Sequence, residues 1–251
     1  MRQRHRFYRH LFLLSVGVMV LIALPYPIRR LSVVCSGLLI LLLTLALGEP
    51  LQPGQHKRRW PDSLYRLIGL AAFGFQVVWL LSPFSGQWSS GVPVMGLLTL
   101  FVFWSLRRLL ICLGRETVIS GQVIMGAVAG YLLLGITGGL LFSVLETVAP
   151  GSFINAARDH QSLAIAVLPQ HPDQLATWTF DLSRIYYFAF VSLTTVGFGD
   201  IVPATPPAQM ASVALSISGP IYLAVVMGLL ISRNTVQPEN HQEERHKRCH
   251  D

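Results

Sequence analysis

Charge is what this sequence has least of. Only 12% of its 251 residues are Asp, Glu, Lys or Arg, while 52% are apolar. Soluble domains carry about 25% charged residues. The charged residues are also unevenly spread, which leaves uncharged runs long enough to cross a bilayer. The composition therefore excludes an ordinary soluble domain and predicts an integral membrane protein.

Several kinds of functional site are missing as well. We find no carboxylate pair, no nucleophile beside a base and no Gly-rich nucleotide loop, so we predict no enzymatic activity and no cofactor. The net charge of +7 does not indicate nucleic-acid binding, because the basic residues border apolar segments instead of forming a separate basic face. No metal-binding or disulfide spacing relates the three cysteines, Cys35, Cys112 and Cys249.

The apolar segments of the sequence predict its membrane helices. Ile185 to Leu193 is too short to cross a membrane and indicates a re-entrant helix, which is tolerated at membrane depth only inside protein or beside water. Two of the longer segments, the first and the fourth, are short for a hydrocarbon layer of about 30 Å. The six predicted spans are Leu11 to Ala23, Leu31 to Leu47, Leu64 to Leu81, Val92 to Leu106, Val118 to Leu145 and Ala208 to Ile231.

Basic residues predict the orientation. They concentrate at the N-terminus, in the loops after the second and fourth spans, and in the C-terminal tail. Cytoplasmic loops are rich in Lys and Arg, so both termini are expected in the cytoplasm. Arg29 and Arg30 are the local exception. No small-residue cleavage pattern follows the first span, so we expect that span to be retained.

The stretch Thr194-Thr195-Val196-Gly197-Phe198-Gly199-Asp200 stands between the short helix and the last span. Alternating glycines permit a backbone of alternating handedness, because Gly adopts positive φ without a Cβ penalty. Such a segment can direct successive carbonyls to one side. Four copies around an axis would then stack rings of oxygens that replace the water shell of a cation. A Gly-rich turn is the alternative, which the apolar helices on both sides disfavour.

This stretch resembles the potassium-channel signature TVGYG, with Phe198 in place of Tyr, and Ser218 to Arg233 resembles the inner helix of bacterial six-span potassium channels. The resemblance implies a homotetramer in a lipid bilayer, with K⁺ ions held in a selectivity filter. It places the Thr195 hydroxyl at the innermost ion site and directs the Phe198 ring away from the axis. The implied filter consists of Thr195, Val196, Gly197, Phe198 and Gly199, and the carbonyls implied to bind K⁺ are those of Thr195, Val196, Gly197 and Phe198.

The residues expected behind the filter depart from the family pattern. Val191 stands where some relatives carry a Glu that pairs with the Asp after the signature, so Asp200 needs another partner. We propose Tyr187, and we expect filter support from Thr194, Asp200, Tyr187 and Val191. The short helix, beginning with Asp181 or Ser183 as its cap, would direct its partly negative C-terminal end toward the ion.

Gly219 and Pro220 stand near the middle of the last span. Pro removes a backbone hydrogen bond and Gly adds freedom, so a bend is expected, and by resemblance Gly219 occupies the position of a gating hinge. Close helix packing at Gly219 is an equally open alternative. One to three turns further on, the candidates for an inner gate that closes by dewetting are Leu223, Val226, Met227 and Leu230.

A voltage sensor is not predicted. Such a sensor needs Arg or Lys at every third residue of a helix, and the fourth span contains neither. Arg107 and Arg108 are adjacent at its cytoplasmic end and are interpreted as inner-surface anchors. The first three spans lack internal acidic residues that could serve as countercharges. We therefore expect weak or absent voltage dependence.

The sequence divides into a four-helix transmembrane module (1–116), a pore domain (117–233) and a cytoplasmic tail (234–251). A short stretch, Leu109 to Glu116, is expected to link the modules, and Asn155 to Val167 is expected to form a short helix in the outward loop. Acidic residues of this loop, Glu146 among them, predict a negative vestibule, with a solvated loop of no function as the alternative.

The predicted fold is an all-α membrane protein with six transmembrane helices, a re-entrant pore helix and a filter. Because the signature occurs once, four chains are needed for a four-fold symmetric pore. The predicted function is a potassium-selective channel that conducts K⁺ passively. A nonselective monovalent cation channel is the alternative, but relatives of that kind usually alter the second half of the signature. A transporter subunit would need four weaker repeats in one chain.

Overall fold

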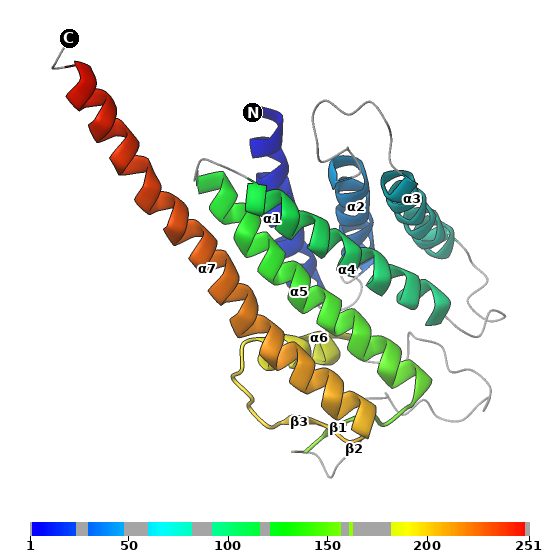
Figure 1. Ribbon diagram of the computed structural model, residues 1–251. Coiled ribbons are helices and arrows are strands. Elements are labelled where there is room, and N and C mark those ends of the chain that lie inside the picture. The colour runs from blue at the N-terminus through cyan, green and yellow to red at the C-terminus, as the bar shows by residue number, and fades with distance from the viewer. Residues whose placement is uncertain are drawn as a thin grey trace.

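The computed structural model describes residues 2–23, 30–47, 60–81, 92–115, 121–156, 161–162 and 182–248. Within these ranges the fold is mostly helical (Figure 1). The start of α1 and the end of α7 lie at one end of the molecule, and a small sheet lies at the other. The helices are α1 (Arg2–Ala23), α2 (Arg30–Leu47), α3 (Trp60–Leu81), α4 (Val92–Arg115), α5 (Gly121–Val148), α6 (Leu182–Leu193) and α7 (Pro206–Arg248).

Membrane-spanning length is found in three helices of the described part of the chain: Met95–Gly114, Gly121–Val148 and Pro206–Val226. Two shorter apolar helices, Phe7–Ile22 and Val34–Leu47, accompany them. Apolar composition and helix length therefore make this a multi-pass membrane protein.

A small three-stranded sheet is a departure from the predicted all-α fold, although helices make up most of the described residues. Its central strand, β1 (Phe153–Asn155), pairs antiparallel with β2 (Gln161–Ser162) and with β3 (Ile201–Pro203). Of the short helix predicted over Asn155 to Val167, Asn155 and Gln161–Ser162 are instead in strands, and most of the remainder lies outside the described residues. Ile154 pairs with Val202, and a contact between such distant segments leaves no local periodicity in the sequence.

Several helices are longer than their apolar segments. The helix α4 runs to Arg115, through most of the stretch expected to be a link, and α7 runs to Arg248, through the segment expected to be a polar tail. That tail is rich in Glu, Gln, Lys and Arg, which are strong helix formers. The helix α7 is also uninterrupted at Gly219 and Pro220.

The helix α5 lies at the centre, beside α1, α4, α6 and α7. Its glycines receive large side chains from three of these neighbours, so closely that a methyl group would displace them. A Cβ would lie 2.6 Å from Tyr8 at Gly126, 2.2 Å from Phe190 at Gly135, 2.5 Å from Leu215 at Gly138 and 2.5 Å from Tyr186 at Gly139. Small residues allow such close approach between membrane helices.

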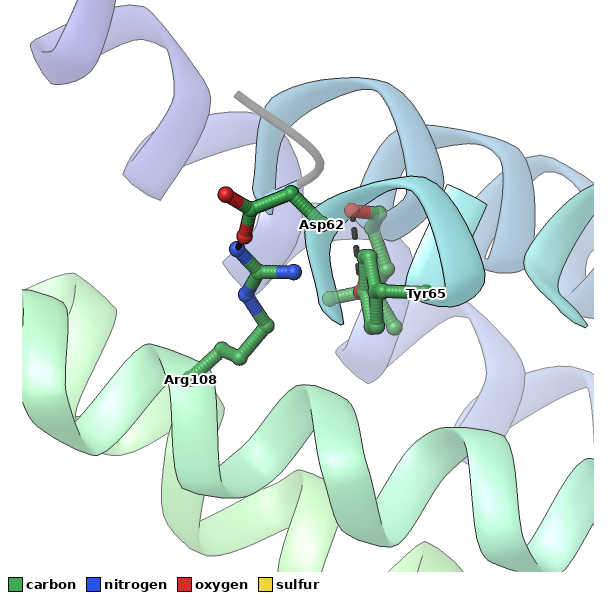
Figure 2. Close-up of polar contacts among 4 residues, drawn as sticks. Asp62, Tyr65 and Arg108 are labelled. Atoms are coloured by element: carbon green, nitrogen blue, oxygen red, sulfur yellow. Dashed lines mark hydrogen bonds and ion pairs between the residues drawn. The ribbon is translucent and has the colours of Figure 1, made fainter. Parts of the chain in front are cut away.

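Arg108 is buried, so its interpretation as an inner-surface anchor was wrong. Its side chain is 6% exposed, forms an ion pair with Asp62 in the first turn of α3, and lies 4.6 Å from the ring centroid of Tyr65 (Figure 2). The Tyr65 hydroxyl donates to the Leu43 carbonyl at 3.1 Å and is hydrogen-bonded to Ser105 at 2.8 Å. The helix α3 begins before its apolar segment, which brings Asp62 beside α4 as a countercharge. Arg107 is exposed.

Candidate functional site

The short helix α6 positions the candidate site. It lies near the sheet, packed against α5 and α7 (Figure 1). Ile185, Ala189 and Leu193 are buried in a cluster with Phe142 of α5 and Ala208 of α7. The helix begins at Leu182, so Ser183 lies within it and is not its cap. Asp181, the other predicted cap, lies outside the described residues.

The segment after α6 is bonded to the last turn of that helix. The Thr194 amide donates to the Phe190 carbonyl at 2.9 Å, and the Thr195 amide donates to the Ser192 carbonyl at 3.0 Å. The Val196 amide donates to the Val191 carbonyl at 3.1 Å. The Thr194 hydroxyl also donates to the Phe190 carbonyl, at 2.8 Å. The entry to the segment is therefore held by backbone atoms of the helix end.

Alternate residues of this segment are left-handed. The φ angles are +59° at Thr195, +58° at Gly197 and +77° at Gly199. The sequence predicted this alternation at the two glycines, and the structure extends it by one step to Thr195. Positive φ at every second residue is the backbone conformation that directs successive carbonyls to one side.

Thr195 is the feature of the backbone that sequence reasoning missed. A β-branched residue at positive φ is a steric outlier, and such strain clusters at functional sites. The Thr195 hydroxyl donates to the Thr194 carbonyl at 2.7 Å. The only signal in the sequence is its place two residues before Gly197, in step with the alternating glycines.

The outer end of the segment contacts Tyr187. The ring of Tyr187 is parallel to that of Phe198, with centroids 6.4 Å apart and an interplanar angle of 2°. Its hydroxyl lies within interaction range of the Asp200 carboxylate, so the structure brings together the pair proposed from the sequence. Val191 is buried. The structure thus brings Thr194, Val191, Tyr187 and Asp200 to the segment, while their role in supporting a filter stays a prediction.

Glu146 is a structural residue that sequence reasoning placed in an open vestibule. Its side chain is instead fully buried at the end of α5. One carboxylate oxygen accepts from the Gly151 amide and the other from the Phe153 amide, both at 2.9 Å. Gly151 has a φ of +85°, which Gly adopts without strain. The one local signal was a turn-forming Pro150-Gly151 shortly after the carboxylate.

The turn held by Glu146 is connected through the sheet to the outer end of the candidate filter. The strand β1 follows it and pairs with β3, which begins one residue after Asp200. The Ala156 amide donates to the Asp200 carbonyl at 2.9 Å, and the Ala204 amide donates to the Ser152 carbonyl at 2.8 Å. Glu146 thereby helps to fix the backbone on both sides of β3.

Gly219 of α7 lies against the end of α6. A Cβ at this position would be 2.0 Å from the Leu193 carbonyl oxygen, so the two backbones are in direct contact. This contact supports the close-packing interpretation of Gly219, and the hinge at Gly219 and Pro220 stays a prediction. Among the gate candidates, Leu223 is exposed and Val226 is buried. The side chains of Met227 and Leu230 lie outside the described residues.

Residues 161–235, which include α6, the Thr194 to Asp200 segment and the first part of α7, match the model of a family described as "Ion channel". This segment is therefore similar to ion-channel domains. Such a domain transports ions and catalyses no reaction. Over 102 residues, 41% of this chain, the sequence is 28% identical to "Two pore potassium channel c" of Oryza sativa subsp. japonica. The match covers 17% of the length of that relative.

Proposed function

We propose that this chain is one subunit of a homotetrameric, potassium-selective channel in the plasma membrane of a prokaryote. Six helices span the bilayer, α6 re-enters it, and both termini are cytoplasmic. The observation that carries the proposal is the alternation of positive φ at Thr195, Gly197 and Gly199, directly after a short helix packed between α5 and α7.

The segment holds K⁺ through its backbone. Carbonyls of Thr195, Val196, Gly197 and Phe198 from four chains form rings that replace the hydration shell of the ion. The C-terminal end of α6 adds partial negative charge beneath them. The parallel rings of Tyr187 and Phe198 and the buried Val191 keep the segment from collapsing or widening.

Neighbouring copies of the chain would cover surfaces that one chain leaves open. Val196 is 53% exposed and Phe198 is 68% exposed. A row of large apolar side chains is exposed along α7 as well: Met210, Val213, Ile217 and Ile221. An apolar strip of this kind beside the filter fits a symmetric interface between subunits around a central axis.

Potassium selectivity is preferred to nonselective cation conduction. The Gly197-Phe198-Gly199 half of the signature is intact, and the two glycines in it have the left-handed conformation that the filter requires. The one relative described above is named a potassium channel, which agrees with this choice.

Ion flux through purified protein in liposomes tests the proposal. We expect uptake of K⁺ or its analogue Rb⁺, little uptake of Na⁺, and block by Ba²⁺, which has nearly the radius of K⁺. Gly197→Ala, which places a Cβ at a positive φ, should abolish the flux. Equal uptake of Na⁺ and K⁺ would favour the nonselective alternative, and no uptake of either ion would contradict conduction.

A further inference from the structure

The side chain of Tyr222 in α7 packs closely against α5. Its side chain is buried, and its hydroxyl donates to the Ala127 carbonyl at 2.6 Å. A Cβ at Gly130 would lie 2.3 Å from the Tyr222 hydroxyl oxygen, so the glycine makes room for the ring. The neighbouring Tyr131 ring packs beside it, with centroids 5.8 Å apart.

The two halves of α7 belong to different cores. The outer half of α7, before Gly219, contributes Ala208 and Leu215 to the cluster that contains Ile185 and Leu193 of α6. The inner half, after Pro220, contributes Tyr222 and Val226 to the cluster formed by the first four helices and α5. That second cluster includes Tyr8 of α1 and Leu109 and Leu113 of α4.

The boundary between the two cores falls at Gly219 and Pro220. Pro220 has no backbone N–H to donate to the carbonyl four residues earlier, so α7 is least constrained at this point. Gly219 contacts the end of α6, and Tyr222 follows one turn later on the same side of α7. If the inner half of α7 moved relative to the filter, either the hydrogen bond from Tyr222 to Ala127 would break or α5 would have to move with α7.

The contact of Tyr222 with α5 lies on a different side of α7 from the exposed apolar residues. Ile217, Ile221 and Val225 are exposed, whereas Tyr222 and Val226 are buried in the core that α5 forms with the first four helices. In the proposed tetramer the exposed side faces the axis and the neighbouring copies. The bond from Tyr222 to Ala127 thus draws the inner half of α7 away from the axis.

We infer that Tyr222 is a positioning residue for gating: it holds the inner half of α7 outward, favours the open pore, and is the contact through which α5, with the first four helices packed behind it, acts on the pore-lining helix. This inference rests on the proposed channel function. The helix α4 packs behind this site on α5, because a Cβ at Gly130 would also lie 3.4 Å from Leu109.

Single-channel recording of the full chain in lipid bilayers tests the inference. Tyr222→Phe removes only the hydroxyl, and we expect open probability to fall at least about fivefold, because the roughly fivefold effect of one lost hydrogen bond is repeated in each of the four subunits. Potassium selectivity and unit conductance should not change, because the filter is untouched. Tyr131→Phe removes a hydroxyl from the adjacent ring without touching the bond to Ala127, and it should match the wild type.

A double-mutant cycle separates this contact from general packing. Gly130→Ala should lower open probability in the wild type, because the new methyl group displaces the Tyr222 hydroxyl. In the Tyr222→Phe background the same substitution should have a much smaller effect. If Gly130→Ala does not assemble, Tyr222→Phe and its Tyr131→Phe control still decide the matter.

The outcomes distinguish the two proposals. A wild type that passes no ions would overturn the channel function, and this inference with it. A wild type that conducts, together with a Tyr222→Phe variant whose open probability is unchanged or higher, would overturn the inference alone. Additive effects of Gly130→Ala and Tyr222→Phe would overturn it as well.

Discussion

Polar contacts between separate segments differ in kind between the first four helices and the region around the candidate filter. In the first region most of them join two side chains: Arg108 pairs with Asp62, Tyr65 is hydrogen-bonded to Ser105, and Gln76 donates to Ser36 at 2.6 Å. Around the candidate filter most of them involve backbone atoms. There Glu146 accepts from two amides, and Val196, Thr194 and Thr195 donate to carbonyls of α6.

This difference indicates what each region must hold in place. In the proposed channel an ion binds to backbone oxygens of the filter, so contacts that fix backbone positions are needed there. The polar contacts within the first four helices hold helices together, which side-chain pairs can do. Substitutions in the first region should therefore change stability more than selectivity, and those near the filter should change both.

The largest effect is expected in the first four helices, at the buried ion pair. Asp62→Asn leaves the Arg108 guanidinium buried without its countercharge, and removing one partner of a buried pair costs about 3–5 kcal/mol. The thermal midpoint of detergent-solubilised protein measures this loss. Arg107→Ala is the matched control, because this exposed neighbour should change stability by less than about 0.5 kcal/mol. Equal midpoints for the two variants would contradict the burial of Arg108.

A smaller loss is expected where α7 meets α6. Gly219→Ala places a methyl group 2.0 Å from the Leu193 carbonyl oxygen, and overpacking of this kind costs about 3 kcal/mol. Because the displaced atom ends the pore helix, flux and ion selectivity should fall together with stability. Gly74→Ala in α3 is the control, since no atom lies within 4 Å of its Cβ position.

Gly219→Ala also separates the two interpretations of this glycine. If Gly219 acts only as a hinge, the variant should keep wild-type thermal stability and selectivity while its open probability falls. A loss of stability with altered selectivity would instead show that close packing against α6 is its main role.

Glu146→Gln tests the turn between α5 and β1, which the Glu146 carboxylate holds through two hydrogen bonds. The amide side chain keeps one acceptor oxygen but presents an NH₂ group to a backbone amide, so about 2 kcal/mol should be lost. We expect faster decline of current at low external K⁺, because the support of Asp200 is weakened. Ser143→Ala is the control, since this hydroxyl donates only within its helix, to the Gly139 carbonyl. Unchanged decline rates would separate Glu146 from the filter.

The smallest effect is expected from voltage. Moving one charge through the membrane field supplies about 2.3 kcal/mol per 100 mV, and Arg108 is held by Asp62 and Tyr65. Conductance in bilayers should therefore change little between positive and negative potentials. An e-fold change over a few millivolts would show that the first four helices do sense voltage.

Local pattern was enough to predict the parts of the fold that depend on it. The apolar segments gave the helices, and the alternating glycines at 197 and 199 gave the backbone of the candidate filter. Tyr187 was proposed as the partner of Asp200 because Val191 stands where some relatives carry a Glu that pairs with this Asp, and the structure places Tyr187 near Asp200.

Contacts between distant segments escaped prediction. The pairing of β1 with β3, the burial of Glu146 and the ion pair of Asp62 with Arg108 each join residues that have no periodic relation in the sequence. The positive φ of Thr195 was missed for a different reason, because threonine disfavours that conformation and only the surrounding backbone imposes it.

The most direct measurement of the central claim is a structure of the assembled protein in Tl⁺ or Rb⁺, with the ions located by their anomalous scattering. The account predicts four chains around one axis, with ions on that axis level with the carbonyls of Thr195, Val196, Gly197 and Phe198. A segment that faces lipid, or an axis without ions at that level, would contradict it.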